Sequence, residues 1–240
     1  MLYCDAHCHL PLSREEDLID VKSLASALNE RELEELWALK KDPFFAGRLF
    51  VSLGIHPYYI EDFDQKSEDM MEKACLLKKI DAIGECGFDL YDRKLKDTLE
   101  MQEKAFAFQA DCAVRYSLPL VIHDRKAFDQ IMVFRKSLSK VRAVYFHGFS
   151  FTVNEASSLL KHGINAYFGF GSVLLKGSSK AIECVRQIED RRILAETDSP
   201  FQMQKGDVRK VYSAIAGIKE MDEEETKEML ENNFSCFLGL

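Results

Sequence analysis

A His-x-His motif near the start of the chain has the residue types and spacing to bind a metal ion. His7 and His9 close a short apolar run that spans residues 1–9. If this run is a strand, its side chains alternate between two faces, and Asp5, His7 and His9 share one of them. On a helix the two histidines would point about 200° apart, because each residue turns the chain by about 100°. The motif therefore predicts a strand whose end carries a pair of metal ligands.

Metal-binding residue types also occur at the ends of five other apolar runs. Five of the six histidines and two acids take such positions, namely His7, His9, His56, Glu85, His123, His147 and Asp198. One histidine after an apolar run is more often a structural residue, but seven groups at equivalent positions predict a shared site. Imidazoles and carboxylates together are suitable ligands for divalent ions.

Apolar runs alternate with segments of helical periodicity along the whole chain. The predicted strands are residues 1–9, 21–28, 49–57, 81–87, 118–123, 143–148, 165–170 and 192–200. The predicted helices are residues 29–40, 67–79, 95–116, 128–138, 154–161, 180–188, 207–219 and 222–238. This alternation predicts a parallel sheet, and about eight βα units predict a (β/α)8 TIM barrel that forms one domain, 1–240. A doubly wound sheet would normally carry a Gly-rich loop after its first strand, and none is present.

The first βα unit departs from the regular pattern. Only about a dozen residues, including the charged run Ser13–Asp17, separate His9 from the second strand, whereas a crossover normally needs room for a helix. We therefore expect a truncated first unit that lacks its outer helix or joins its two strands by a loop.

Composition and charge restrict the classes of function. The formal net charge of −8 argues against a broad basic surface for duplex nucleic acid, but not against a local basic pocket or a metal site. Seven cysteines with irregular spacing and no Cys-x-x-Cys pair predict reduced thiols. No apolar run approaches the ~18 residues of a membrane span, and no signal peptide is visible. We expect a cytoplasmic protein that does not bind membranes.

Six motifs, in this order, resemble those of TatD-type metal-dependent hydrolases, a branch of the amidohydrolase-like barrel superfamily. They are Asp5–Leu10, Gly54–Pro57, Ile83–Asp89, Val121–Arg125, Phe146–Ser150 and Glu196–Pro200. Each motif alone is weak, but the ordered set spans nearly the whole chain. The resemblance implies a first ion on His7, His9 and Asp198, a second ion on His123 and His147, and a bridging Glu85. It also implies that His56 contacts substrate.

For several residues near the predicted site, the sequence allows both a functional and a structural role. His56 either contacts substrate or shapes the turn before Pro57. Arg125 and Lys126 either grip a phosphate or lie in a solvated loop. We expect Asp5 to contact a ligating histidine from behind, because it lies further along the strand from the metal.

The resemblance implies a divalent-metal-dependent deoxyribonuclease of the 3′–5′ exonuclease type. Two cations about 3.5–4 Å apart can hold a bridging hydroxide and clamp a phosphoryl oxygen. Zinc and manganese suit this ligand set, whereas magnesium tolerates imidazole less well. Asp198 is positioned in the motif to accept a proton from the attacking water. Because the chain is acidic, we expect DNA ends or single-stranded DNA as substrate, where only a few phosphates are contacted.

Two alternative functions stay open at this point. The same dinuclear site can hydrolyse amide, lactone or aminoacyl-ester bonds, because it can direct a hydroxide at a carbonyl carbon. A non-enzymatic barrel could also retain its metal for stability. The segments Gly148–Phe151 and Phe201–Lys205 differ from the family pattern next to the substrate, so the substrate is less well determined than the metal site.

Overall fold

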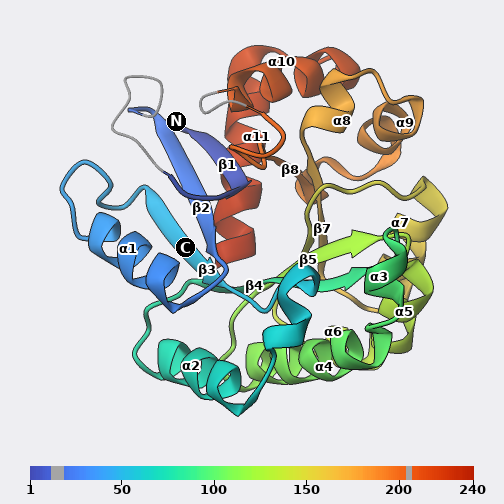
Figure 1. Ribbon diagram of the computed structural model, residues 1–240. Helices are drawn as coiled ribbons and strands as arrows, with labels where there is room; N and C mark the ends of the chain where they lie inside the picture. Colours follow the sequence, from blue (N-terminus) through green and yellow to red (C-terminus); the bar gives the residue numbers. More distant parts are fainter. Residues whose placement is uncertain (12–18, 204–206) are drawn as a thin grey trace.

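Eight parallel strands, in chain order, form the centre of the molecule (Figure 1). The computed structural model describes residues 1–11, 19–203 and 207–240. The strands are β1 (Tyr3–Cys8), β2 (Val21–Ala27), β3 (Leu49–Leu53), β4 (Ala82–Asp89), β5 (Leu120–Arg125), β6 (Val144–Phe146), β7 (Ala166–Phe170) and β8 (Ile193–Ala195). Each strand pairs in parallel with the next one, so all eight predicted strands are confirmed.

The sheet closes between β1 and the segment that follows β8. Cys8 forms a β-bridge with Ser199, and His9 N donates to Ser199 O over 2.7 Å. Asp198 N donates to His7 O over 2.9 Å. The predicted (β/α)8 barrel is therefore confirmed, and its closing seam places His7, His9 and Asp198 next to one another.

Helices surround the barrel between successive strands. They are α1 (Glu30–Lys40), η2 (Pro57–Asp62), α2 (Gln65–Leu76), α3 (Arg93–Lys96), α4 (Leu99–Arg115), α5 (Phe128–Val133), α6 (Arg135–Leu138), α7 (Val153–Lys161), α8 (Ser172–Leu175), α9 (Ser179–Gln187), η3 (Asp190–Arg192), α10 (Val208–Lys219) and α11 (Glu223–Leu238), where η marks a 3-10 helix. Each predicted helical segment contains a helix, but 128–138 is divided at Phe134, whose ψ of 5° leaves helical geometry. The predicted helix 95–116 is divided into α3 and α4. The short helices η2, α8 and η3 were missed, because so few residues display too little of the helical period.

Two strands end at least four residues earlier than the sequence predicts. β3 stops at Leu53 rather than Pro57, because the fixed φ of Pro57 begins the 3-10 helix η2. His56 caps this helix, since its Nδ1 accepts a hydrogen bond from Tyr58 N over 3.0 Å. β8 stops at Ala195, so Asp198 lies beyond the regular strand.

The first βα unit is only partly described. β1 and β2 pair in parallel, and residues 9–11 and 19–20 between them contain no helix. The predicted loop Ser13–Asp17 lies outside the described residues, so the predicted truncation of this unit stays a prediction.

A cluster that draws on all eight strands fills the barrel interior. It contains Cys4, Ala6, Leu24, Phe50, Ala82, Val121, Tyr145, Tyr167 and Leu194. Phe237 from α11 joins it, with its ring 5.4 Å from that of Tyr145 and 5.7 Å from that of Tyr167. The helix α11, red and beside β1 in Figure 1, therefore packs near the N-terminal ends of the strands and leaves the other end for the histidines.

Strict alternation of side chains fails along β1. The register with β2 shifts between Asp5 and Cys8, where β1 contains one extra residue. Cys4 packs in the barrel interior, whereas Cys8 packs with Tyr3 in the outer cluster. Regular alternation predicts that Cys4 and Cys8 share a face of the strand, and this prediction is wrong. Cys8 is a buried packing residue, with its Sγ 3.6 Å from Leu24 O.

Candidate metal centre

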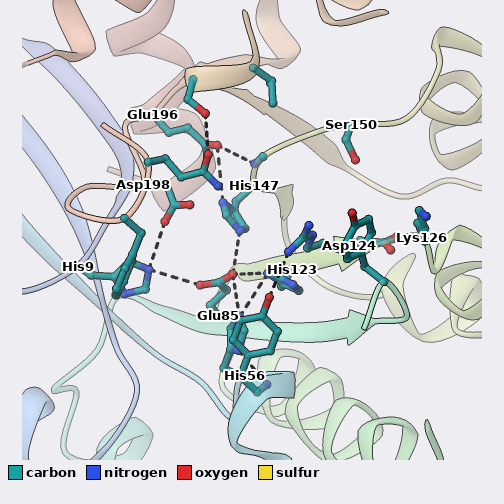
Figure 2. A pocket seen from close by; sticks show the side chains of 18 of the residues that line it. His9, His56, Glu85, His123, Asp124, Lys126, His147, Ser150, Glu196 and Asp198 are labelled. Atoms are coloured by element: carbon teal, nitrogen blue, oxygen red, sulfur yellow. Dashed lines mark hydrogen bonds and ion pairs between the residues drawn. The ribbon is translucent and has the colours of Figure 1, made fainter. Parts of the chain in front are cut away.

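The seven residues predicted from strand ends meet at the carboxylate of Glu85. They are His7, His9, His56, Glu85, His123, His147 and Asp198, and their side chains are between 0 % and 16 % exposed. Figure 2 shows six of them, all except His7. Six of the seven lie in the last three residues of a strand or within three residues after it. Glu85 lies deeper, in the middle of β4. The structure thus brings together every residue that the sequence predicted as a metal ligand.

One oxygen of Glu85 faces three imidazoles. Oε1 lies 2.7 Å from His123 Nδ1, 2.8 Å from His147 Nε2 and 3.3 Å from His56 Nε2. His56 Nε2 also lies 3.3 Å from His123 Nδ1. Three nitrogen donors therefore surround one carboxylate oxygen on this side of the cluster.

The other oxygen of Glu85 faces the two histidines of the His-x-His motif. Oε2 lies 3.1 Å from His7 Nε2 and 3.5 Å from His9 Nε2. Asp198 Oδ1 completes this group, 3.5 Å from His9 Nε2 and 3.8 Å from His7 Nε2. Glu85 therefore stands between two separate sets of donors, as a bridging carboxylate would.

Burial and mutual charge set the protonation of these groups. Burial by itself raises the pKa of Glu85, but the imidazoles, with His147 first, outweigh it and hold that pKa well below its ordinary value. Burial lowers the pKa of His7, which favours the neutral imidazole that binds metal ions. Burial also acts to lower the pKa of His9, but the carboxylates of Asp198 and Glu85 raise it to about 9.

The histidines of this cluster fit a metal ion because several of their buried nitrogen atoms form no hydrogen bond. Among the described residues, eight buried side-chain polar atoms have no hydrogen-bond partner, and four of them are His7 Nδ1, His7 Nε2, His9 Nδ1 and His147 Nδ1. An unsatisfied buried polar atom is costly, and a coordinated cation removes that cost. Within the described residues, two triplets have ligand atoms within 4.8 Å of one another: His7, His9 and Glu85, and His56, Glu85 and His123.

Two further carboxylates stand behind the histidines. Asp89 Oδ2 lies 3.2 Å from His123 Nε2, and Asp89 is fully buried. Glu196 was missed as a functional residue. Its Oε1 accepts a hydrogen bond from Gly148 N over 2.7 Å and lies 3.6 Å from His147 Nδ1. Its position two residues before Asp198, at the end of an apolar run, was the available signal.

Tyr145 holds Glu196 in place from the barrel interior. Its hydroxyl donates a hydrogen bond to Glu196 Oε2, and a Cβ atom on Gly169 would overlap both groups. Replacing Tyr145 by Phe should free Glu196 and lower the affinity for Mn²⁺ by about 10- to 100-fold, the usual effect of losing a partner behind a ligand. Calorimetric titration of the metal-free protein with Mn²⁺ measures this effect. Tyr167→Phe, at another tyrosine of the barrel interior, is the control, and equal losses in both variants would contradict the assignment.

Two buried glutamines on α4 were also missed. Gln109 brackets Ile55, since Ile55 N donates to its Oε1 over 2.7 Å and its Nε2 donates to Ile55 O over 3.3 Å. Gln102 accepts from Asp89 N over 3.0 Å. These glutamines fix the backbone beside His56 and Asp89. A polar residue on the buried face of a predicted amphipathic helix was their only signal in the sequence.

Replacing Gln109 by Leu should destabilise the protein by about 1–3 kcal/mol, because Ile55 N and O lose their partners in a buried position. Urea unfolding monitored by circular dichroism measures the change. The exposed Gln187→Leu provides a matched control that should change stability little. Equal stability of the two variants would show that the bracket around Ile55 contributes nothing.

Asp5 contacts a predicted ligand only through the backbone. Its carboxylate accepts hydrogen bonds from Thr197 N over 2.9 Å and Thr197 Oγ1 over 2.6 Å. Asp5 Oδ1 also accepts a hydrogen bond from His7 N over 3.4 Å. The expected contact with a ligating histidine is therefore present, but it is made to the backbone of His7 and not to its ring. Because Thr197 precedes Asp198, Asp5 also ties the His7 strand to the segment that carries Asp198.

Six residues of the cluster, all except the fully buried His7, line an open pocket of about 750 Å³. His56 is buried beside Glu85, within reach of both a metal ion and a substrate, and is not at the outer rim. Arg125 is exposed in the pocket wall, where its Nη1 donates to Tyr58 Oη over 3.1 Å and lies 3.8 Å from Asp89 Oδ2. Substrate contact by His56 and Arg125 stays a prediction.

Comparison with known proteins identifies the family. The crystal structure of YjjV, a TatD homologue from Escherichia coli, matches with a TM-score of 0.87 at 23 % identity, covering 99 % of this chain and 98 % of that chain. The sequence model of the family described as TatD related DNase matches residues 4–239. This chain belongs to that family. The TatD resemblance predicted from the sequence is confirmed.

Two relatives of this TatD-family chain carry names that differ in how closely they specify an activity. An uncharacterized metal-dependent hydrolase from Mycoplasma pneumoniae is 31 % identical over 218 residues, 84 % of this chain and 82 % of its own length. The human protein named 3′–5′ RNA nuclease TATDN2 is 30 % identical over 189 residues, 77 % of this chain but 23 % of its own length. The family and the buried cluster together make this chain a metal-dependent hydrolase.

A helix that crosses a membrane must be both long and apolar. Within the described residues, no helix combines the length and the apolar composition that crossing a membrane requires.

Proposed function

We propose that this chain is a divalent-metal-dependent nuclease that cleaves phosphodiesters in DNA in the 3′–5′ direction. The observation that carries the proposal is the position of Glu85 between two sets of imidazoles in an open pocket. Family membership supports hydrolysis with metal ions, and the human relative named a 3′–5′ RNA nuclease supports a nucleic-acid substrate.

The ligand set would hold two ions. We assign His7, His9 and Asp198 to the first ion, His123 and His147 to the second, and Glu85 to both. When bound, such ions lower the pKa of water and stabilise charge on phosphoryl oxygens. Imidazole-rich sites favour zinc or manganese over magnesium. His56 is a further donor on the second side, since its Nε2 lies 3.3 Å from Glu85 Oε1.

Asp198 is the residue we assign as general base. Its side chain is 16 % exposed, against 4 % for Glu85, so it is the carboxylate of the cluster that substrate and water reach first. Its pKa is lowered, against the effect of burial, by the hydrogen bond from His9 and the charges of His147 and His7, so it is ionised and able to accept a proton. His56 and Arg125 would orient the phosphate on the opposite side.

The charge distribution favours single strands or DNA ends as substrate. The chain carries a formal net charge of −8, yet Arg125, Lys126 and Lys180 line the pocket. A duplex needs many phosphate contacts along its length, whereas a strand end in this pocket needs only a few.

The test is degradation of end-labelled single-stranded DNA by the purified protein. We expect cleavage with Mn²⁺ or Zn²⁺, no cleavage with a chelator, and recovery when the metal is restored. Mononucleotides released from the 3′ end would establish the polarity. An RNA strand of the same sequence tests whether the sugar matters.

A second set of substrates separates the proposal from its alternatives. Amides, lactones and aminoacyl esters are tested under the same metal conditions. Faster turnover of a carbonyl substrate than of DNA would contradict the nuclease assignment. Tight metal binding without turnover of any substrate would contradict hydrolysis altogether and favour a non-enzymatic barrel.

We also propose that the protein works in the cytoplasm. No disulfide bond joins any of the seven cysteines, all of which lie in the described residues, and six of them are buried. Reduced cysteines of this kind are typical of a reducing compartment.

A further inference from the structure

The exposed tyrosines of this protein gather at the mouth of one pocket. Among the described residues, which include all eight tyrosines, only Tyr58, Tyr59 and Tyr91 are exposed, at 52 %, 50 % and 58 %. All three line the pocket that contains Glu85. Single exposed aromatic side chains scattered over a surface are normal, whereas a group of them at one pocket indicates a binding surface.

Two cations approach the ring of Tyr91. The guanidinium carbon of Arg125 lies 4.6 Å from the ring centroid, and Lys126 Nζ lies 4.5 Å from it. Neighbouring residues of an extended chain normally point in opposite directions. Lys126 has a positive φ of 57°, which turns the chain so that both side chains reach the same ring. We call Tyr58, Tyr91, Arg125 and Lys126 the aromatic-basic rim.

The positive charge of the rim is largely free for a ligand. Lys126 forms no ion pair among the described residues, and Arg125 is 3.8 Å from the buried Asp89, which also contacts His123. Asp124 lies next to both cations in the chain, but its Oδ1 accepts from Ala127 N. In Figure 2 Lys126 and Asp124 lie to one side of the histidines, in the wall of the pocket.

The rim is continuous with the candidate metal centre. Tyr58 Oη accepts a hydrogen bond from Arg125 Nη1 over 3.1 Å. The ring of Tyr58 lies 4.8 Å from that of His56 and 6.0 Å from that of His123. A phosphate held at the metal centre would therefore have the rim within reach of the adjoining nucleotide on the side of His56 and His123.

We propose that the aromatic-basic rim is a nucleotide-binding subsite, where a base of single-stranded DNA stacks on Tyr91 and the adjoining phosphates contact Arg125 and Lys126. A duplex hides the faces of its bases, so the subsite selects an unpaired strand. Stacking on aromatic rings and cationic contact with phosphates is the usual combination in proteins that bind single strands. This inference rests on the proposed nuclease function and adds the residues that choose the form of DNA.

The test compares strands with and without bases. Fluorescence anisotropy measures binding of labelled oligothymidylate with phosphorothioate linkages, which resist hydrolysis, to the intact protein with Mn²⁺. The second probe has the same backbone with abasic residues. We expect Tyr91→Leu to weaken binding of oligothymidylate about tenfold, the effect of losing one stacked base, and to leave abasic binding unchanged. Tyr91→Phe keeps the ring and should bind like the original protein.

Two other variants isolate the stacking and the charge. Tyr116→Leu is the control, because Tyr116 also lies under an arginine, with Arg115 at 5.4 Å, but is not among the residues that line the pocket. Lys126→Ala should weaken the binding of both probes alike and reduce its dependence on salt.

Three results would overturn the inference. They are equal effects of Tyr91→Leu on both probes, an effect of Tyr116→Leu as large as that of Tyr91→Leu, and no binding of oligothymidylate at all. Cleavage of single-stranded DNA is measured separately, so the nuclease proposal stands or falls independently of the rim. If the unmodified protein does not cleave single-stranded DNA, the nuclease proposal is contradicted. If it cleaves normally but Tyr91→Leu leaves oligothymidylate binding unchanged, only the subsite is contradicted.

Discussion

Replacing Glu85 by Gln should lower metal-dependent DNA cleavage by about 10³-fold or more. The substituted side chain would keep its size but lose the charge that faces His7 on one side and His147 on the other. Ions that no longer share a carboxylate lose their fixed separation, and metal ions in such sites contribute several kcal/mol to the transition state. Initial rates on single-stranded DNA, at saturating Mn²⁺, measure the effect.

The matched control for this variant removes a carboxylate elsewhere. Glu231→Gln loses an ion pair with Lys22 Nζ, at 2.7 Å, at the opposite end of the barrel. We expect this variant to keep its activity. The same variants should be compared by thermal unfolding, so that a loss of rate is not a loss of fold. A Glu85→Gln protein that cleaves DNA at the original rate would contradict the bridging role.

Asp198→Asn should lower the cleavage rate by about 10²- to 10⁴-fold, the range for the loss of a general base. The substitution suits this position, because Asp198 has a positive φ of 52° and asparagine adopts that conformation readily. The hydrogen bond from Asp198 N to His7 O belongs to the backbone and should survive. The measurement is the rate at saturating substrate and metal, followed across pH.

The pH profile distinguishes a lost base from a lost metal ligand. If Asp198 accepts the proton, its loss should lower the rate at all metal concentrations and remove the acidic limb of the profile. If Asp198 only binds metal, added Mn²⁺ should restore most of the rate. If Asp198→Asn keeps full activity at the Mn²⁺ concentration that the original protein needs, both roles are contradicted.

The sequence predicted the barrel and the meeting of the seven strand-end residues because both follow from local patterns. Apolar runs of strand length ended in His7, His123 and other metal-binding residue types, and a parallel barrel brings such ends together. The His-x-His spacing pointed to a strand before any other residue was considered. These features depend on short segments, so they can be recognised without knowing the tertiary contacts.

Residues that act through tertiary contacts were not predictable in this way. Glu196 contacts the backbone of Gly148 only because the ends of β6 and β8 adjoin β7 from opposite sides. Gln109 is polar on a buried helix face, and its partner Ile55 is 54 residues away. The register shift in β1 places Cys8 in a different cluster from Cys4, and alternation alone could not reveal it.

The most direct test of the two-ion centre is to count the metal ions and place them. Crystals of the protein soaked with Mn²⁺ are measured at wavelengths on both sides of the manganese absorption edge, and anomalous difference maps locate each ion. We predict two peaks, one between His7, His9 and Glu85 and the other between Glu85, His123 and His147. A single peak, or peaks that do not contact Glu85, would contradict the two-ion centre on which the proposed function rests.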